Sequence, residues 1–256
     1  NIAKLVFALS FLVFLAAKYL FNFDPQILSG IAIAVFLSIL LLAFEEFIPS
    51  AKTEHKTAKD NLVETAGAVV AAVVLYALLG FLLHTPTPIN VITSCSMLPA
   101  YDRGDLIILS GDEPRAPEIR VSGDSSTFSF EKTNCTRLYN DGRQSSDICT
   151  SALKFDSLPL IPVNKSNDLI VYDSQSSIGL IVHRVIAKVT ADDGKEFYIT
   201  KGDNNAASDQ EFGIPPIPKD KVNGKVILRI PFIGYIKLFL FLQFQEPPYC
   251  DSHYKD

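Results

Sequence analysis

Long apolar runs fill the first third of the chain. Residues 25–44 and 65–83 carry no charged side chain, and residues 5–23 are interrupted only by Lys18. Each run has about the length that an α-helix needs to cross the hydrocarbon core of a bilayer. Lys18 can lie along its helix and place its ammonium at the interface. The pattern predicts three transmembrane helices, at about 4–23, 25–45 and 65–84.

Loop charge orients these helices. The loop between the second and third helices carries Lys52, Lys56 and Lys59, whereas the link between the first and second carries no lysine or arginine. Basic loops stay in the cytoplasm. The third helix therefore runs outward, and the rest of the chain is expected to be extracytoplasmic.

Beyond residue 84 the periodicity changes to short β-branched and aliphatic runs, separated by clusters of Gly, Asn, Asp, Ser and Pro. This pattern is typical of antiparallel β-structure. We expect strands at 106–109, 168–172, 179–189, 197–200 and 222–230. The predicted fold is membrane-anchored and mainly β, with an antiparallel β domain at 87–236.

Two segments depart from this pattern. Residues 111–166 are polar and irregular, and we interpret them as an insertion with a hairpin of its own around 126–130. Residues 230–244 are apolar but short and interrupted by Lys237. An interfacial segment at the membrane surface is favoured there over a tilted fourth helix. Within 230–256, the polar tail from residue 245 is expected to be frayed.

The composition argues against several classes of function. The net charge of −5 and pI near 5.4 argue against nucleic-acid binding, which calls for a basic stripe. None of the four cysteines forms a Cys-x-x-Cys pair, so zinc or thioredoxin-like chemistry is not indicated. Cys135 and Cys149 could form a disulfide or remain two thiols. Cys95 is expected to pack as a small hydrophobe. The sequence indicates no metal and no organic cofactor.

Four short motifs carry the candidate chemistry. Residues 94–99 read SCSMLP, with Ser96 just beyond the third apolar run, and Gly104-Asp105 opens the next strand. His183 lies in the strand-like IVHRVI of 181–186, and residues 201–209 read KGDNNAASD. Taken singly, these are a surface hydroxyl, a structural histidine and a polar turn. Their joint occurrence in this order, after an apolar segment, favours a catalytic site.

Together the motifs resemble the type I signal peptidase family, in its archaeal and endoplasmic-reticulum branch. The first motif is similar to the Ser-x-Ser-Met-x-Pro box, in which the second serine, here Ser96, is the nucleophile. The bacterial branch has a lysine base where this chain has His183, and Lys188 and Lys201 fall outside that position. Ala100 stands where many members carry threonine. The resemblance covers about 88–109 and 167–236, but not the insertion or the first two helices.

The resemblance implies a Ser/His/Asp site. A serine needs an adjacent base to take its proton, and histidine, with an ordinary pKa of about 6.5, can accept and return it. The resemblance gives the third role to Asp209, with Asp203 supporting the site. It also implies an oxyanion hole made by the Ser94 hydroxyl and the Ser96 N–H. Spacing alone leaves open which aspartate contacts His183.

The implied function is a membrane-bound serine endopeptidase that removes signal peptides from exported preproteins after small-x-small sites. The expected partners are those signal peptides, the lipid bilayer, and a translocon or partner subunits. Three helices before the serine favour an archaeal cell membrane over the endoplasmic reticulum. The main alternative is a non-catalytic, membrane-anchored β binding module of the same fold. A soluble self-cleaving Ser/Lys protease fits less well, because of the apolar segments and His183.

Overall fold

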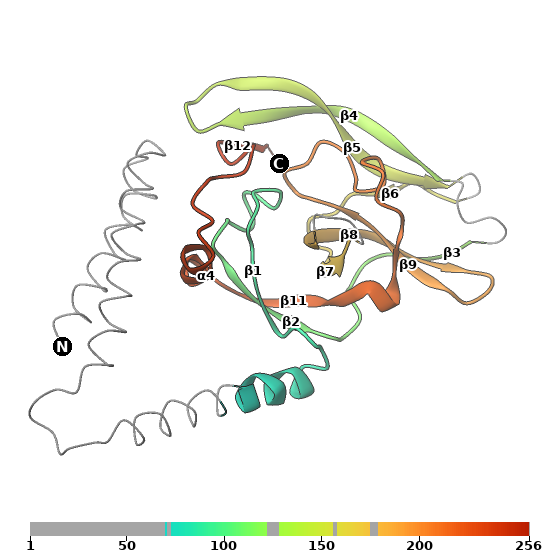
Figure 1. Ribbon diagram of the computed structural model, residues 1–256. Helices are drawn as coiled ribbons and strands as arrows, with labels where there is room; N and C mark the ends of the chain where they lie inside the picture. The colour runs from blue at the N-terminus through green and yellow to red at the C-terminus, as the bar shows by residue number, and fades with distance from the viewer. Residues whose placement is uncertain (1–69, 71–72, 122–127, 156–157, 175–178, 256) are drawn as a thin grey trace, which may run out of the picture. The chain divides into compact units, whose positions relative to one another are not determined.

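The computed structural model describes residues 70, 73–121, 128–155, 158–174 and 179–255 (Figure 1). The chain divides into two compact units, residues 1–78 with 235–246 and residues 79–234 with 247–256. All described strands lie in the second unit and form two sheets. The predicted class, mainly antiparallel β, is confirmed for this part of the chain.

The larger sheet has eight strands in the order β1-β2-β11-β7-β8-β9-β10, with β3 pairing β8 in parallel. Its strands are β1 (Ile89–Val91), β2 (Leu106–Ser110), β3 (Glu118–Val121), β7 (Leu169–Asp173), β8 (Leu180–Ala191), β9 (Glu196–Lys201), β10 (Ile217–Pro218) and β11 (Val222–Ile230). The smaller sheet has the order β12-β4-β5-β6, with β4 (Phe128–Tyr139), β5 (Gln144–Phe155), β6 (Ile161–Pro162) and β12 (Ser252–Tyr254). The described helical segments include residues 73–82, the 3₁₀ turn η1 (Lys219–Lys221) and α4 (Tyr235–Leu240).

The five strands expected from the apolar runs are β2, β7, β8, β9 and β11, each within two residues of its predicted ends. In β7 and in the middle of β8, the near-continuous apolar character reflects burial on both faces. In β7, for example, four of the five side chains are buried. Buried strands of this kind show as apolar runs more than as alternating patterns.

The interpretation of 111–166 as mostly irregular was wrong. This stretch contains β3 and a hairpin of two twelve-residue strands, β4 and β5, which extends far beyond the hairpin expected around 126–130. Its turn is at Asp141-Gly142, where Gly142 has φ +86° and the Asp141 side chain accepts a bond from the Arg143 N–H at 3.0 Å. The Asp-Gly pair is a hairpin signal. The polar composition of the strands hid it, because polar side chains make up most of 129–137 and 144–147.

The hairpin is fastened to the larger sheet by an apolar cluster. Leu153 and Phe155 of β5 are buried against Ile186 of β8 and Ile199 of β9. Burial of each such side chain contributes about 1.5–3 kcal/mol. The hairpin therefore shares a core with the strands that carry the candidate site.

The predicted spans at 4–23 and 25–45 lie outside the described residues. Of the third, residues 73–82 are helical, and apolar side chains such as Val73 and Leu75 are exposed there. Among the residues that the structure describes, no helix has the length and apolar content needed to cross a bilayer.

The expectation of a frayed tail was wrong. Residues 252–254 form β12, which pairs with β4, and Cys250 is disulfide-bonded. Within 230–244, the structure contains the short helix α4.

Candidate active site

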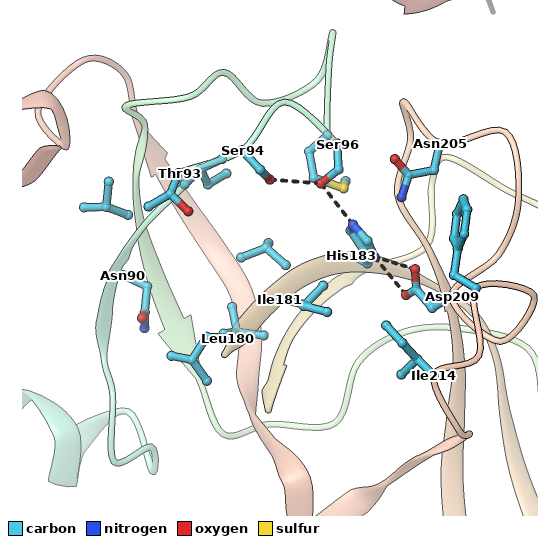
Figure 2. A pocket seen from close by; sticks show the side chains of 16 residues that line it. Asn90, Thr93, Ser94, Ser96, Leu180, Ile181, His183, Asn205, Asp209 and Ile214 are labelled. Atoms are coloured by element: carbon cyan, nitrogen blue, oxygen red, sulfur yellow. Dashed lines mark hydrogen bonds and ion pairs between the residues drawn. The ribbon is translucent and has the colours of Figure 1, made fainter. Parts of the chain in front are cut away.

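Ser96 lies on the loop between β1 and β2 (Figure 2). Backbone bonds close the base of this loop, from Ile92 N–H to the Asp105 carbonyl at 2.9 Å and from Gly104 N–H to the Ile92 carbonyl at 2.8 Å. Met97, next to the serine, is 1% exposed. The buried thioether and the closed loop base fix the backbone on which the Ser96 hydroxyl is presented.

His183 comes from β8, the strand that pairs with β7 on one side and β9 on the other. His183 is buried, with 6% of its surface exposed. A strand flanked on both sides moves little. The imidazole is therefore held on a rigid element facing the serine loop.

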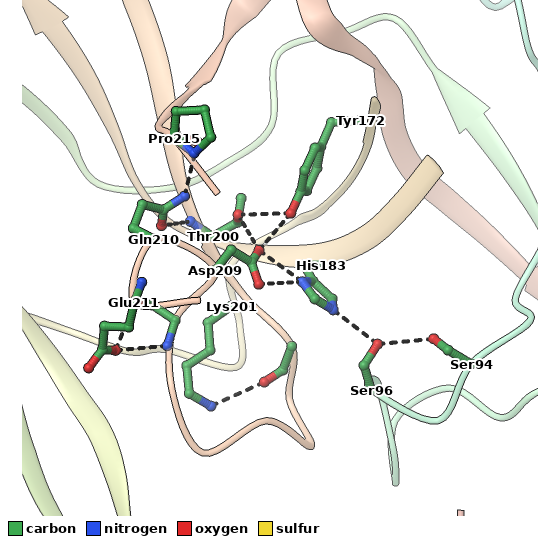
Figure 3. Close-up of polar contacts among 12 residues, drawn as sticks. Ser94, Ser96, Tyr172, His183, Thr200, Lys201, Asp209, Gln210, Glu211 and Pro215 are labelled. Carbon is green, nitrogen blue, oxygen red and sulfur yellow. Dashed lines mark hydrogen bonds and ion pairs between the residues drawn. The ribbon is translucent and has the colours of Figure 1, made fainter. Parts of the chain in front are cut away.

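Asp209 lies in the loop that follows β9. Its backbone N–H donates to the Thr200 carbonyl at 3.0 Å, which anchors the loop on the end of the strand. The carboxylate is 1% exposed and accepts from Tyr172 Oη at 2.7 Å and from Thr200 Oγ1 at 2.5 Å (Figure 3). These donors fix the carboxylate before any substrate is present.

The three side chains form one continuous line of hydrogen bonds. Ser96 Oγ is 3.0 Å from His183 Nε2, and His183 Nδ1 is 2.7 and 2.8 Å from the two oxygens of Asp209. With Nδ1–H donating to the carboxylate, Nε2 is left to accept from the serine hydroxyl. This is the geometry of a serine activated by a histidine that a carboxylate orients.

The structure also decides between the two aspartates. Asp209 contacts His183, whereas Asp203 forms a two-point ion pair with Arg184 at 2.8 and 2.6 Å. Arg184 also donates to the Asn167 carbonyl. Asp203 thus holds its loop against β8 and does not contact the histidine ring.

Burial and charge act in opposite directions on Asp209. Burial raises the pKa of its carboxyl, but the adjacent His183 ring and the donors Thr200 and Tyr172 outweigh burial, so the pKa lies below its usual value. The carboxylate is therefore ionised at neutral pH. In this state it can stabilise an imidazolium on His183.

Lys201 is a further buried ionisable group near the site. Burial lowers its pKa to about 8, and its ammonium donates to the Gly202 carbonyl at 3.1 Å. The base within hydrogen-bond distance of Ser96 is His183. In the described part of the chain, no three His, Cys, Asp or Glu side chains are grouped as a metal site requires.

Gly202 is required by close approach. A Cβ at this position would lie 2.8 Å from three atoms: His183 Nε2, Ser96 O and Asn205 Nδ2. Any side chain would push the histidine and the serine loop apart. Glycine is therefore required at position 202 for steric reasons. From the sequence, residues 201–209 had the composition of an ordinary polar turn.

Ser94 stands next to the nucleophile. Its hydroxyl is 3.2 Å from Ser96 Oγ, on the side opposite His183 (Figures 2 and 3). A hydroxyl there, together with the Ser96 N–H, is suited to donate to an oxyanion formed at a carbonyl that Ser96 attacks.

A pocket of about 450 Å³ opens beside the three residues (Figure 2). One wall is formed by residues 90–94 and the other by 180–182, and its lining is mostly apolar. Leu180, 47% exposed, is the first residue of β8. The two walls are the ends of strands, so an extended peptide could lie between them.

Several residues of the site carried no sequence signal. Tyr172 and Thr200 hold Asp209 from within strands, where they look like ordinary β-formers. Asn204, in the KGDNNAASD motif, donates from its side chain to the Cys95 carbonyl at 3.0 Å. Its backbone N–H donates to the Ser96 carbonyl at 2.7 Å. Only the three-dimensional arrangement identifies these roles.

The cysteines are all paired. Cys135 and Cys149 form a disulfide within the hairpin, which resolves the alternative left open by the sequence. The expectation for Cys95 was wrong: although it is buried, it is bonded to Cys250, 155 residues away. The separation in sequence gave no reason to pair them.

Comparison with known proteins also supports a signal peptidase. The chain is 28% identical over 159 residues to a signal peptidase complex catalytic subunit of Sclerotinia sclerotiorum, covering 61% of this chain and 65% of that protein. It is 25% identical over 194 residues to the protein of the same name from Colletotrichum graminicola, covering 75% and 86%.

This chain is homologous to signal peptidase catalytic subunits. A third relative of that name, from Tuber melanosporum, is 29% identical over 160 residues, covering 61% of this chain and 64% of its own length. No model of a protein family matches the chain. The resemblance drawn from the four motifs is thereby confirmed. The three relatives are fungal and lend no support to the archaeal preference.

Proposed function

We propose that this chain is a serine endopeptidase that cleaves signal peptides from preproteins, with Ser96 as nucleophile. The observation that carries the proposal is the line of contacts from Ser96 Oγ through His183 to Asp209, at 3.0 and 2.7 Å. A binding module needs no buried carboxylate aligned on a histidine that faces a serine. The names of the homologous catalytic subunits support the same activity.

The proposed reaction is acyl transfer. Ser96 Oγ attacks the scissile carbonyl while His183 Nε2 takes the hydroxyl proton, and Asp209 stabilises the imidazolium that forms. The Ser94 hydroxyl and the Ser96 N–H donate to the oxyanion of the tetrahedral intermediate. The imidazolium then protonates the leaving amine, and water hydrolyses the ester by the same steps. No metal or organic cofactor enters the scheme.

The pocket supports an extended peptide as substrate. It is flanked by β1 and by the start of β8, so the peptide can add as a strand between them. Ile92 and Val182 in its lining are apolar, which suits small apolar side chains of a substrate. Signal peptides end in small residues at positions −1 and −3. Cleavage after small-x-small sites follows from this fit.

The proposed setting is the outer side of a membrane, with the apolar segments at 4–23, 25–45 and 65–84 as anchors. Two disulfides, Cys95–Cys250 and Cys135–Cys149, support an oxidising compartment for the β unit. The fungal relatives favour the endoplasmic-reticulum membrane over an archaeal cell membrane. Their names, which place them in a signal peptidase complex, support partner subunits. Contact with a translocon and with lipid is part of the proposal.

The test is cleavage of a preprotein in liposomes by the wild type, Ser96→Ala, His183→Ala and His183→Lys. We expect cleavage after a small-x-small site by the wild type and loss of at least about 10³-fold in both alanine variants. Changing the residues at −1 and −3 of the substrate to large ones should abolish cleavage. Equal cleavage by wild type and Ser96→Ala would overturn the proposal, and an inactive wild type would favour the binding module. High activity in His183→Lys would weaken the case for a histidine base.

A further inference from the structure

The backbone around Ser96 is fastened to the end of the chain. Cys95, directly before the nucleophile, is 5% exposed and disulfide-bonded to Cys250. Residues 247–254, which we name the C-terminal strap, thus share a covalent bond with the serine loop. The proposed reaction uses no residue of the strap.

Asn204 ties the strap to the same backbone. Its side-chain amide donates to the Cys95 carbonyl at 3.0 Å and to the Ser252 carbonyl at 2.8 Å, and lies 3.2 Å from the Tyr249 carbonyl. Its own N–H donates to the Ser96 carbonyl at 2.7 Å. The carbonyls on both sides of Ser96 Cα are therefore held by one residue, which also holds the strap.

The strap is held in turn by the hairpin β4–β5. β12 pairs with β4, and the buried Arg137 of β4 donates to Ser252 Oγ at 3.1 Å and to Tyr254 Oη at 2.7 Å. The Arg137 guanidinium also stacks over the rings of Tyr249 and Tyr254, at 4.8 and 4.2 Å from their centres. Both ends of the strap are thus fixed on one buried side chain.

The hairpin also contacts the loop that carries Asp209. Thr150 N–H of β5 donates to the Ala206 carbonyl at 2.8 Å. Glu211 accepts from the Thr150 hydroxyl at 2.5 Å and from Ser208 N–H at 2.8 Å, and pairs with Lys132 of β4 at 3.0 Å. One hairpin therefore braces the aspartate loop directly and the serine loop through the strap.

We propose that the C-terminal strap, fastened through Cys95–Cys250 and Asn204, positions Ser96 against His183, and that cleavage therefore depends on this disulfide being formed. The proposal rests on the proposed function. The strap is bonded to Cys95, next to the nucleophile, and Asn204 binds both the strap and the backbone around Ser96, so release of the strap should affect the chemical step more than substrate binding. A displacement of about 1 Å at a reacting group can cost about 10²-fold in rate.

The chain supplies its own matched control. Cys135 and Cys149 form the second disulfide, which spans neighbouring strands of the hairpin. Cys135→Ala/Cys149→Ala removes a disulfide without releasing the strap. In this variant, Cys95–Cys250 is the disulfide that a dithiol can reduce. The dithiol supplies two electrons and two protons, so that Cys95 and Cys250 become thiols and the dithiol becomes a cyclic disulfide.

The experiment compares kcat and KM for a preprotein among three forms of the full chain in liposomes: wild type, Cys135→Ala/Cys149→Ala and Cys95→Ala/Cys250→Ala. Circular dichroism sets a temperature at which all are folded. We expect kcat to fall about 10- to 100-fold in the Cys95/Cys250 variant, with KM within about twofold. The Cys135/Cys149 variant should keep its kcat within about twofold.

Reduction provides a second measurement if the Cys95/Cys250 variant does not fold. Dithiol treatment of the Cys135/Cys149 variant should lower kcat by the same factor while the circular dichroism is unchanged, and re-oxidation should restore it. Equal kcat before and after reduction in a folded enzyme would overturn the positioning proposal. A wild type that cleaves no preprotein would instead overturn the proposed function, so the two failures are distinguishable.

Discussion

Two neighbouring residues of β8 carry out different tasks with the same kind of partner. His183 and Arg184 each bind an aspartate from the loop after β9, Asp209 and Asp203 respectively. Both pairs are buried, with side-chain exposures of 7% and 1% in one and 8% and 4% in the other. Successive strand residues point to opposite faces of the sheet. The two pairs therefore bind the loop on opposite faces of β8.

The difference lies in the nitrogen atoms that each side chain has left after binding its aspartate. Arg184 binds Asp203 through two nitrogens and its third donates to the Asn167 carbonyl, so the pair can only hold the loop. His183 retains one ring nitrogen, 3.0 Å from Ser96 Oγ, and can gain and lose a proton. A side chain held by an aspartate can act as a catalytic base when it can exchange a proton and still has a nitrogen that faces the nucleophile.

Asp209→Asn should break the first pair with the largest effect on activity. The amide cannot hold the required histidine tautomer, so we expect kcat to fall about 10⁴-fold with the fold retained. Preprotein cleavage kinetics measure the fall, and circular dichroism checks the fold. Asp203→Asn is the matched control, with kcat per folded molecule expected within about tenfold of wild type. Similar losses in the two variants would contradict the division of roles.

Arg184→Met should break the second pair and affect stability instead. It leaves the Asp203 carboxylate buried without its cation, which costs about 3–5 kcal/mol of unfolding free energy. Urea denaturation measures this cost. The double variant Arg184→Met/Asp203→Leu removes both charges and should recover part of it. A stability unchanged from wild type in the single variant would argue that the pair is not held as the structure indicates.

Thr200→Val sharpens the comparison by loosening Asp209 without removing it. The substitution deletes the donor 2.5 Å from Asp209 Oδ2 while keeping the shape of the side chain. Hydrogen bonds to charged groups contribute about 1.5–3 kcal/mol, so we expect a stability loss in that range and a fall in kcat of about tenfold. Tyr172→Phe, which removes the second donor, should behave alike. A fall in kcat as large as that of Asp209→Asn would mean that Asp209 depends on these donors for its whole effect on catalysis.

The smallest expected effect is on the pH dependence of stability. The adjacent His183 ring and the hydroxyl donors hold the pKa of Asp209 below its ordinary value, so the folded protein binds this proton less readily than the unfolded chain. Its contribution to stability is present above the unfolded pKa and is lost as the pH falls through the folded pKa. Urea denaturation between pH 6 and pH 3 should therefore show a steeper acid loss in wild type than in Asp209→Asn. Parallel curves would contradict the lowered pKa.

Five strands of the larger sheet were predictable because they are apolar runs bounded by turn residues, whereas β1, β3 and β10 were not expected. β2, β7, β8, β9 and β11 were all expected. The hairpin β4–β5 was missed because much of both strands is polar, and the apolar residues that it adds to the core, such as Phe128 and Phe155, lie at the end far from the turn. Composition detects buried strands better than exposed ones.

The sequence by itself determined the candidate nucleophile, the base and two possible aspartates, because Ser96, His183, Asp203 and Asp209 lie in short motifs with characteristic neighbours. It also determined the β-class of the second unit, through the apolar runs. The three N-terminal spans stay predictions. Each of these inferences uses residues close together in the chain, where local pattern and local structure coincide.

Only the tertiary structure decided which aspartate meets the histidine. Asp203 and Asp209 occupy one polar loop, and nothing in that loop distinguishes them until β8 presents His183 on one face and Arg184 on the other. The same holds for Cys95 and Cys250, 155 residues apart, which meet because Arg137 and β4 hold the strap beside the serine loop. Contacts of this kind depend on how strands stack and pair, which is a property of the whole fold and not of any short stretch of sequence.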